Sequence, residues 1–239
     1  MDALDIIRRE GDAFYAVAST ADPTRRVPSC PEWDIADLVW HLAEVHRFWA
    51  EVVERQLQDP DEAEAGAPER PGDLEGLVAM GRGNLDRLLT ALAGADDDTP
   101  VWTWASQRDV GFIRRHQVQE AFIHRWDLQQ AAGVDPDPID PEAAADAIDE
   151  LLAMTLPWGV DAGRPLPGSV HLHCTDTTGE WVIHADGRVE AIHAKGDVAV
   201  RGTASDLVLA LYGRVDLSAV DVFGDEAVAA ELLRRLDMS

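Results

Sequence analysis

The sequence predicts a two-domain protein, an all-α helical bundle followed by a small α+β domain with an antiparallel sheet. Apolar residues recur every three to four positions up to about residue 156, which is the period of amphipathic helices. Six prolines and glycines between positions 157 and 168 then interrupt this pattern. Beyond them, apolar and polar residues alternate as in half-buried strands. We therefore expect domains at residues 1–157 and 168–239.

The first domain is expected to hold four long helices and one shorter helix. The second helix has Asp34 as its N-cap and a continuous apolar stripe from Ile35 to Val52, and Gly133 ends the fourth. The Pro-, Gly- and acid-rich stretch at 59–73 predicts a mobile surface loop. The expected helices span residues 2–20, 34–58, 74–93, 110–132 and 141–156.

The second domain is expected to combine strands with two helices. Thr203 and Asp206 resemble a capping box that begins one helix, which Gly213 closes. The segment DEAVAAELLRRL predicts the last helix. The expected strands span residues 169–174, 180–184, 188–194 and 197–202.

Composition argues against polyanionic partners. The chain has 239 residues, with 20 basic and 45 acidic side chains and a net charge of -25, which opposes binding to nucleic acid or to anionic membranes. The N-terminus lacks a basic leader, and no apolar run reaches about 18 residues. We expect a cytoplasmic monomer that acts on small molecules. Cys30 and Cys174 are expected to be reduced thiols.

Glu120 and His124 are the most informative pair in the sequence. They lie at i and i+4 near the centre of the apolar face of the fourth helix, so a carboxylate oxygen and an imidazole nitrogen can reach one ion. A buried carboxylate without a partner costs several kcal/mol or more, and a divalent metal would remove that cost. The alternative is a structural salt bridge, either within the pair or from Glu120 to a nearby arginine: Arg114, Arg115 or Arg125.

A metal held by this pair needs a third ligand from another helix. His41 and His46 lie on opposite shoulders of the apolar stripe of the second helix, and geometry alone does not choose between them. His116 extends the row to HxxxExxxH, as a ligand or as a donor to one. It is less favoured than His41, because three ligands from one helix rarely surround an ion.

Two segments carry a family resemblance. VPSCPEWDIADLVWHLAEVHRFW followed by QVQEAFIHRWDLQ resembles the mycothiol-dependent maleylpyruvate isomerase family, whose N-terminal half is a DinB-like four-helix bundle. The tail from GTASDLVLALYG to AAELLRRL looks like that family's C-terminal domain, which is related to sterol carrier proteins. By position, the resemblance implies His41, Glu120 and His124 as metal ligands, and so favours His41 over His46.

The resemblance also implies a reaction. Two histidines and one carboxylate suit Zn²⁺ with an open fourth position, and Ni²⁺, Fe²⁺ or Mn²⁺ would fit as well. Mycothiol or a similar thiol would bind there as cosubstrate for isomerisation or thiol transfer on a small electrophile. Arg214 is implied as the catalytic anchor for an anionic substrate, with Arg201 as another candidate. The competing interpretation is a noncatalytic, metal-dependent protein that binds a small ligand.

Two further groups have open interpretations. His171 and His173 alternate onto one face of a strand and could chelate an ion, but a solvated strand face is favoured. Five tryptophans in the first domain are expected to pack in the core, with the lining of a ligand pocket as the alternative. These are Trp33, Trp40, Trp102, Trp104 and Trp126.

Overall fold

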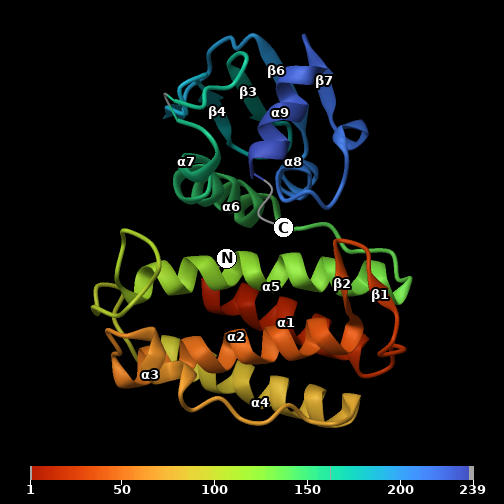
Figure 1. Ribbon diagram of the computed structural model, residues 1–239, viewed down its shortest axis with the longest axis vertical. Coiled ribbons are helices and arrows are strands. Elements are labelled where there is room, and N and C mark those ends of the chain that lie inside the picture. Colours follow the sequence, from red (N-terminus) through yellow and green to blue (C-terminus); the bar gives the residue numbers. More distant parts are fainter. Residues whose placement is uncertain (1, 162, 237–239) are drawn as a thin grey trace. The chain divides into compact units, whose positions relative to one another are not determined.

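The computed structural model describes residues 2–161 and 163–236, in two compact units (Figure 1). The first unit comprises residues 1–137 and the second residues 138–239. This division lies earlier in the chain than the expected boundary at 157–168. The reason is that helix α6 (Pro141–Met154) packs against α8 (Ala204–Leu211), so its apolar face belongs to the second core.

Four long helices form the first unit, as predicted. Helices α1 and α2 each pack against both α4 and α5, which closes a four-helix arrangement (Figure 1). Fully buried side chains from all four helices, such as Phe14, Leu42, Leu88 and Phe122, fill its centre. The long helices are α1 (Ala3–Ala18), α2 (Ile35–Arg55), α4 (Leu74–Ala93) and α5 (Val110–Ala132).

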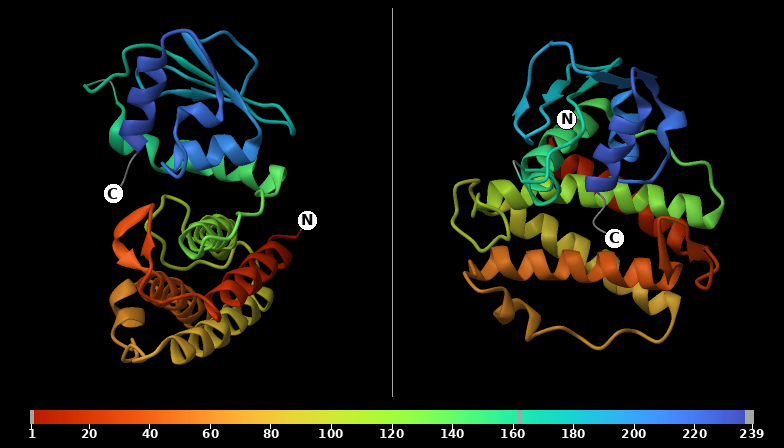
Figure 2. Two further views of the ribbon diagram at one scale, coloured as in Figure 1. Left: turned by 90° about the vertical axis from the view of Figure 1, so that its right-hand side faces the viewer. Right: turned by 45° about the horizontal axis from the view of Figure 1, so that its top comes forward.

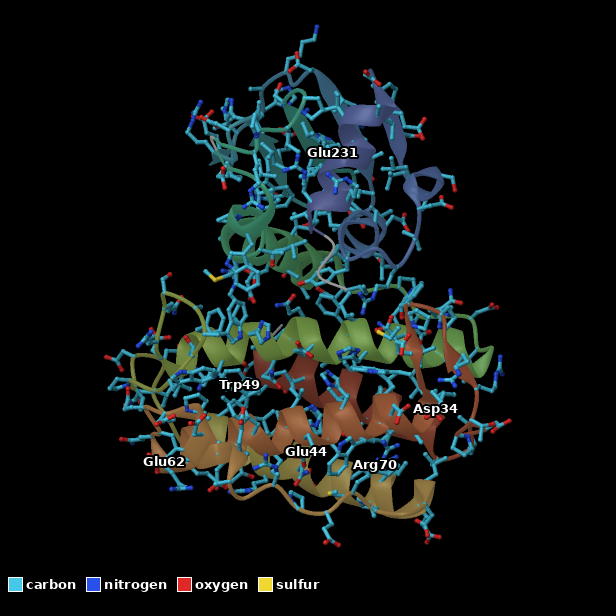
Figure 3. The ribbon with its side chains drawn as sticks, in the orientation of Figure 1. Asp34, Glu44, Trp49, Glu62, Arg70 and Glu231 are labelled. Atoms are coloured by element: carbon cyan, nitrogen blue, oxygen red, sulfur yellow. The ribbon has the colours of Figure 1, made fainter. Side chains whose placement is uncertain are left out.

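The predicted caps are present at the ends of α2 and α5. The Asp34 side chain accepts a hydrogen bond from the backbone of Asp37 and completes a capping box where β2 leads into α2 (Figure 3). Gly133 ends α5 in the left-handed region, with φ 73°. In Figure 3, Arg70 lies beside α2, and its guanidinium donates to Asp37 at 2.7 Å.

The sequence did not reveal two short elements of this unit. Strands β1 (Arg26–Val27) and β2 (Cys30–Asp34) form an antiparallel hairpin where only a turn was expected. Helix α3 (Pro60–Glu64) occupies part of the expected loop at 59–73. Among the tryptophans considered for the core, Trp126 is buried, whereas Trp104 is 40% exposed.

The second unit is an α+β domain, as predicted, around a five-stranded sheet. The strand order is β5-β4-β3-β6-β7, and helices α8 and α9 both contact β3 and β6, so they cover one face (Figure 2). Leu172 of β3 faces those helices, since it lines a small cavity with Leu207 of α8 and Leu232 of α9. The strands are β3 (Val170–Cys174), β4 (Glu180–Ile183), β5 (Val189–Glu190), β6 (Val198–Gly202) and β7 (Asp221–Phe223), and the last helix is α9 (Glu226–Leu236).

The sheet has mostly antiparallel pairs, as expected, and one parallel pair. Strands β3 and β6 are parallel and the other neighbours are antiparallel. Strand β5 lies at the far edge beyond β4, so residues 191–197 must cross the sheet to place β6 on the other side of β3. Two short helical turns, α7 (Leu156–Gly159) and η1 (Leu217–Ala219), complete the unit. In the described part of the chain, no helix is long and apolar enough to cross a membrane.

Candidate metal centre

Three side chains of the first unit bring potential metal ligands together. His41 comes from α2, and Glu120 and His124 come from α5, which packs against α2. One ligand atom from each residue lies within 4.8 Å of the other two. The close packing of these two helices therefore joins residues that are about 80 positions apart in the sequence.

Glu120 lies between two imidazoles of its own helix. Its carboxylate oxygens are 3.4 Å from His116 Nε2 and 3.3 Å from His124 Nε2, and its side chain is 23% exposed. Burial raises the pKa of this carboxyl, but the contacts with His116 and His124 outweigh burial and hold the pKa well below its usual range. Glu120 is therefore ionised, which is the form that binds a metal.

His124 is oriented by a carboxylate behind it. Its Nδ1 is 3.1 Å from Asp127 Oδ2, and Ser29 Oγ donates to Asp127 Oδ1 at 2.6 Å. Asp127 is fully buried. Burial lowers the pKa of His124, but Asp127 and Glu120 outweigh burial and raise it to about 9. A carboxylate on Nδ1 leaves Nε2 directed at Glu120, as in many metal-binding histidines.

His41 completes the group from the opposite helix. Its ring meets that of His124 edge to face at a centroid distance of 4.9 Å, and the Trp33 ring lies 4.8 Å away on another side. Burial, followed by the charge of His124, lowers the pKa of His41 to about 4. The imidazole is therefore neutral at neutral pH and has a lone pair for a metal.

The other candidates from the sequence have different neighbours. His46 is 1% exposed, and its Nδ1 lies 3.3 Å from the Tyr15 hydroxyl. His116 stacks on Phe112 at a ring distance of 5.6 Å and supports Glu120 from the side. Neither histidine belongs to the ligand group found in the described residues.

Two of the arginines considered as partners of Glu120, Arg114 and Arg125, have contacts with other groups. Arg114 pairs with Asp97 and donates to the Leu92 carbonyl at 2.6 Å. Arg125 pairs with Glu10 at 2.7 Å. The described contacts of these two arginines therefore give no support to a salt bridge with Glu120.

Two polar residues of α5 near the site were given no role from the sequence. Asp127 follows His124 by three positions, a spacing that places both on one side of a helix and could have revealed it. Gln117 precedes Glu120 by three positions and is 1% exposed. Neither polar atom of its amide has a hydrogen-bond partner among the described residues, which is unusual for a buried group.

This donor set fits a divalent transition metal. Two imidazole nitrogens and one carboxylate oxygen come from two helices, and one imidazole has a carboxylate on its other nitrogen. Three protein ligands leave at least one coordination position for a small molecule, as in catalytic rather than structural zinc sites.

Comparison with known families accounts for both units. The family described as the mycothiol maleylpyruvate isomerase N-terminal domain matches residues 4–129, more than half of the chain. The chain belongs to the mycothiol maleylpyruvate isomerase family. The C-terminal domain of this family matches residues 142–231, a range that includes nearly all of α6. A search of curated proteins gives no match.

Two solved structures share the fold of the whole chain. The crystal structure of the mycothiol-dependent maleylpyruvate isomerase aligns with a TM-score of 0.62 and 16% identity, covering 92% of this chain and 91% of that chain. The structure of a histidine-to-alanine mutant of the same name aligns with a TM-score of 0.65 and 13% identity, with the same coverage. These likenesses support the two-unit fold of the mycothiol maleylpyruvate isomerase family.

The remaining predicted residues lie apart from the three ligands in sequence. Arg214 follows α8 and donates from Nη1 to the Tyr212 carbonyl at 2.9 Å, and Arg201 is an exposed residue of β6. Both belong to the second unit, and their role toward a substrate remains a prediction. Cys30 lies half-buried in β2, and burial raises the pKa of Cys174 to about 11.

Proposed function

We propose that this member of the mycothiol maleylpyruvate isomerase family is a metal-dependent enzyme that uses mycothiol or a similar thiol. It would isomerise a small electrophilic substrate or transfer the thiol to it. The observation that carries the proposal is the convergence of His41, Glu120 and His124 with Asp127 behind His124. Membership of the mycothiol maleylpyruvate isomerase family supports a thiol-dependent reaction at this site.

Zinc is the metal that this donor set favours, and Ni²⁺, Fe²⁺ or Mn²⁺ would also be accepted. When bound, the metal would supply an open position and lower the pKa of a thiol there, so that a thiolate forms at neutral pH. His41 and His124 would contribute nitrogens and Glu120 an oxygen. Asp127 would hold His124 in the tautomer with a free Nε2, and His116 would hold the Glu120 carboxylate.

The thiol chemistry accounts for isomerisation without net redox change. The thiolate sulfur adds to one carbon of a cis double bond conjugated to a carbonyl, and the electron pair moves to the carbonyl oxygen as an enolate. The former double bond can then rotate. Return of the electron pair expels the thiolate and restores the double bond in the trans form. An anionic substrate would need a cationic anchor, and Arg214 is the proposed one.

Thiol-dependent turnover tests the proposal. The full chain is treated with a chelator, reloaded with Zn²⁺ and assayed with mycothiol and maleylpyruvate, then with a panel of other electrophiles. We expect activity that is lost on chelation and restored by Zn²⁺. Glu120→Gln should lower kcat/KM more than about 100-fold. Loss of a residue that only hydrogen-bonds to a metal ligand lowers activity about 10- to 100-fold, and loss of the ligand itself should lower it at least as much. Glu44→Gln, on the same helix as His41, is the matched control and should retain activity.

The rival function is noncatalytic binding of a small ligand with the same metal. Every structural feature described above is also compatible with this function, because fold does not determine function. Zinc binding that depends on Glu120, without turnover of any thiol and electrophile pair, would favour the rival. Absence of zinc binding in both the wild-type protein and Glu120→Gln would contradict both functions.

A further inference from the structure

A second group of metal-ligating side chains lies on the sheet of the second unit. His171 and His173 come from β3, Glu180 comes from β4, and His193 follows β5. One ligand atom from each of the four lies within 4.8 Å of the other three. All four belong to residues 138–239, so this group shares no residue with the candidate centre of the first unit.

The register of the sheet brings three of them onto one face. His173 and Glu180 are directly opposed in the antiparallel β3–β4 pair, so their side chains share a face. His171 lies two residues before His173 and points the same way. Leu172, between the two histidines, faces α8 and α9, so the group lies on the sheet face away from those helices.

His193 reaches the group from the segment that crosses the sheet. Residues 191–197 join β5 to β6 and pass close to β3, since a Cβ on Gly196 would lie 2.8 Å from the backbone nitrogen of His171. The His193 ring lies 5.8 Å from that of His171 and 6.4 Å from that of His173. Its side chain is nonetheless 81% exposed.

Glu180 is the one carboxylate in this group of four and does not pair with all three imidazoles. Glu180 contacts Nδ1 of His173 and lies 2.7 Å from Nδ1 of His193. His171 is 9% exposed, and its Nε2 has no hydrogen-bond partner among the described residues. That atom lies 3.8 Å from Glu180 Oε2, beyond hydrogen-bond distance. A buried imidazole nitrogen directed at three other ligand groups needs a partner of the kind that a metal provides.

Acidic side chains lie near this group. His173, Glu180 and His193 line a groove of about 840 Å³, and Glu142 and Asp146 of α6 line it as well. These carboxylates share one face of α6, because they are four residues apart. They would raise the local concentration of a divalent cation near the histidines.

We propose that His171, His173, Glu180 and His193 bind a divalent transition metal, with Zn²⁺ as the ion best suited. Three imidazoles and one carboxylate are ligands that Zn²⁺ accepts, and four of them fill a tetrahedral shell. A filled shell is characteristic of structural rather than catalytic sites. The metal would fasten residues 191–197 to β3 and β4, and the current contacts of Glu180 with the imidazoles would be replaced by bonds to the ion.

Zinc stoichiometry of the full chain tests this proposal. Chelator-treated protein is titrated with Zn²⁺ by calorimetry in four forms: wild type, His124→Ala, His193→Ala and the double variant. We expect the wild type to bind two equivalents of zinc, each single variant to bind one, and the double variant to bind none. His193 is exposed in a connecting segment, so its replacement should not impair folding. His124→Ala removes the first centre, so the second site is measured alone in that background.

Matched substitutions keep the result interpretable. His184→Ala is the control, since His184 lies just after β4 and contacts Glu190 at 2.8 Å, outside the group. It should retain both zinc equivalents, whereas Glu180→Gln should lose one. In the His124→Ala background, Zn²⁺ should also slow amide hydrogen exchange in residues 191–197, and His193→Ala should abolish that effect.

Three results would overturn the proposal. The first is a His124→Ala variant that binds no zinc. The second is unchanged stoichiometry in both His193→Ala and Glu180→Gln. The third is equal loss of zinc from His184→Ala and His193→Ala, which would indicate nonspecific binding to surface histidines. If the wild type binds one zinc that His193→Ala loses and His124→Ala retains, the second site stands and the metal centre of the proposed function fails.

Discussion

Asp127 contacts Nδ1 of His124 and leaves Nε2 directed at the proposed metal centre. Its Oδ2 lies 3.1 Å from Nδ1, and the residue is fully buried. We predict that Asp127→Asn lowers zinc affinity of the first centre by about 10- to 100-fold, because the amide holds the tautomer less well and makes the imidazole less basic. Competition with a chromophoric chelator in the His193→Ala background measures this. Asp12→Asn, at an exposed position, should leave affinity unchanged, and equal affinity in the Asp127 variant would contradict the assigned role.

We predict that His46 makes the stability of the protein depend on pH. Burial lowers its pKa to about 3, against an ordinary value of 6.5. Below pH 6.5 the unfolded chain binds a proton that the folded chain excludes, so the free energy of unfolding falls as pH decreases toward 3. The slope from one such group approaches about 1.4 kcal/mol per pH unit. Above pH 6.5 both states are neutral at this residue and its contribution is constant.

Urea denaturation of chelator-treated protein between pH 7 and pH 4 checks this prediction. We expect His46→Gln, which can still contact the Tyr15 hydroxyl, to show a shallower loss of stability on acidification than the wild type. His184→Gln serves as the control and should keep the wild-type slope. If His46→Gln also keeps that slope, another group is responsible for the acid sensitivity.

The sequence predicts individual residues of the site unevenly. Glu120 and His124 are evident from their spacing on one helix, whereas choosing His41 over His46 required a family resemblance, because both flank the same stripe. The structure separates them, since His46 lies beside Tyr15 and His41 beside His124. Asp127 could have been found from its spacing to His124, whereas His193 could not, because its role depends on a segment that crosses the sheet.

At the scale of elements, a buried ion pair joins α5 to α1. Arg125 Nε donates to Glu10 at 2.7 Å, and their side chains are only 2% and 7% exposed. Arg125→Met leaves Glu10 with Arg9 as its remaining partner, 2.8 Å away, and should cost up to about 3 kcal/mol of folding stability. Arg8→Met removes an exposed pair with Asp86 and should cost at most about 1 kcal/mol. Chemical denaturation measures the free energy of unfolding of both variants. Equal losses in Arg125→Met and Arg8→Met would contradict the importance of the buried pair.

Most helices were predictable because their sequence signals are local. The caps and apolar periodicity of α4 and α5 predict both elements with the bounds that the structure shows. The β1–β2 hairpin was missed because its strands are short and Pro28 and Pro31 resemble a plain turn. The parallel pairing of β3 and β6 depends on the route of residues 191–197, which alternation along single strands does not encode.

At the scale of the whole molecule, each proposed metal site lies within one unit. His41, Glu120, His124, Asp127 and Ser29 all precede residue 138, where the units divide. We predict that a chain ending at Asp137 binds one zinc ion and that its His124→Ala variant binds none. Circular dichroism establishes that the shortened chain is helical, and calorimetry gives the stoichiometry. A helical fragment without zinc binding would show that the second unit is required for the first centre.

The structure divides the chain earlier than the sequence predicts, for a physical reason. The glycines and prolines at 157–168 are a stronger local signal than the short connection at 133–140, yet α6 has its apolar face against α8. Family matching agrees with the structure, because the C-terminal domain match begins at residue 142. Composition and periodicity therefore predict the fold class, while the assignment of a helix to one core depends on packing.

We propose that His41, Glu120 and His124 together hold a catalytic divalent metal. Anomalous scattering from crystals of the zinc-loaded full chain, collected on both sides of the zinc absorption edge, tests it most directly. We expect a zinc peak bonded to one nitrogen of each histidine and to Glu120, with a further position open to solvent or thiol. Absence of a peak among these three residues in zinc-loaded crystals, with Glu120 paired only to His116 and His124, would contradict it.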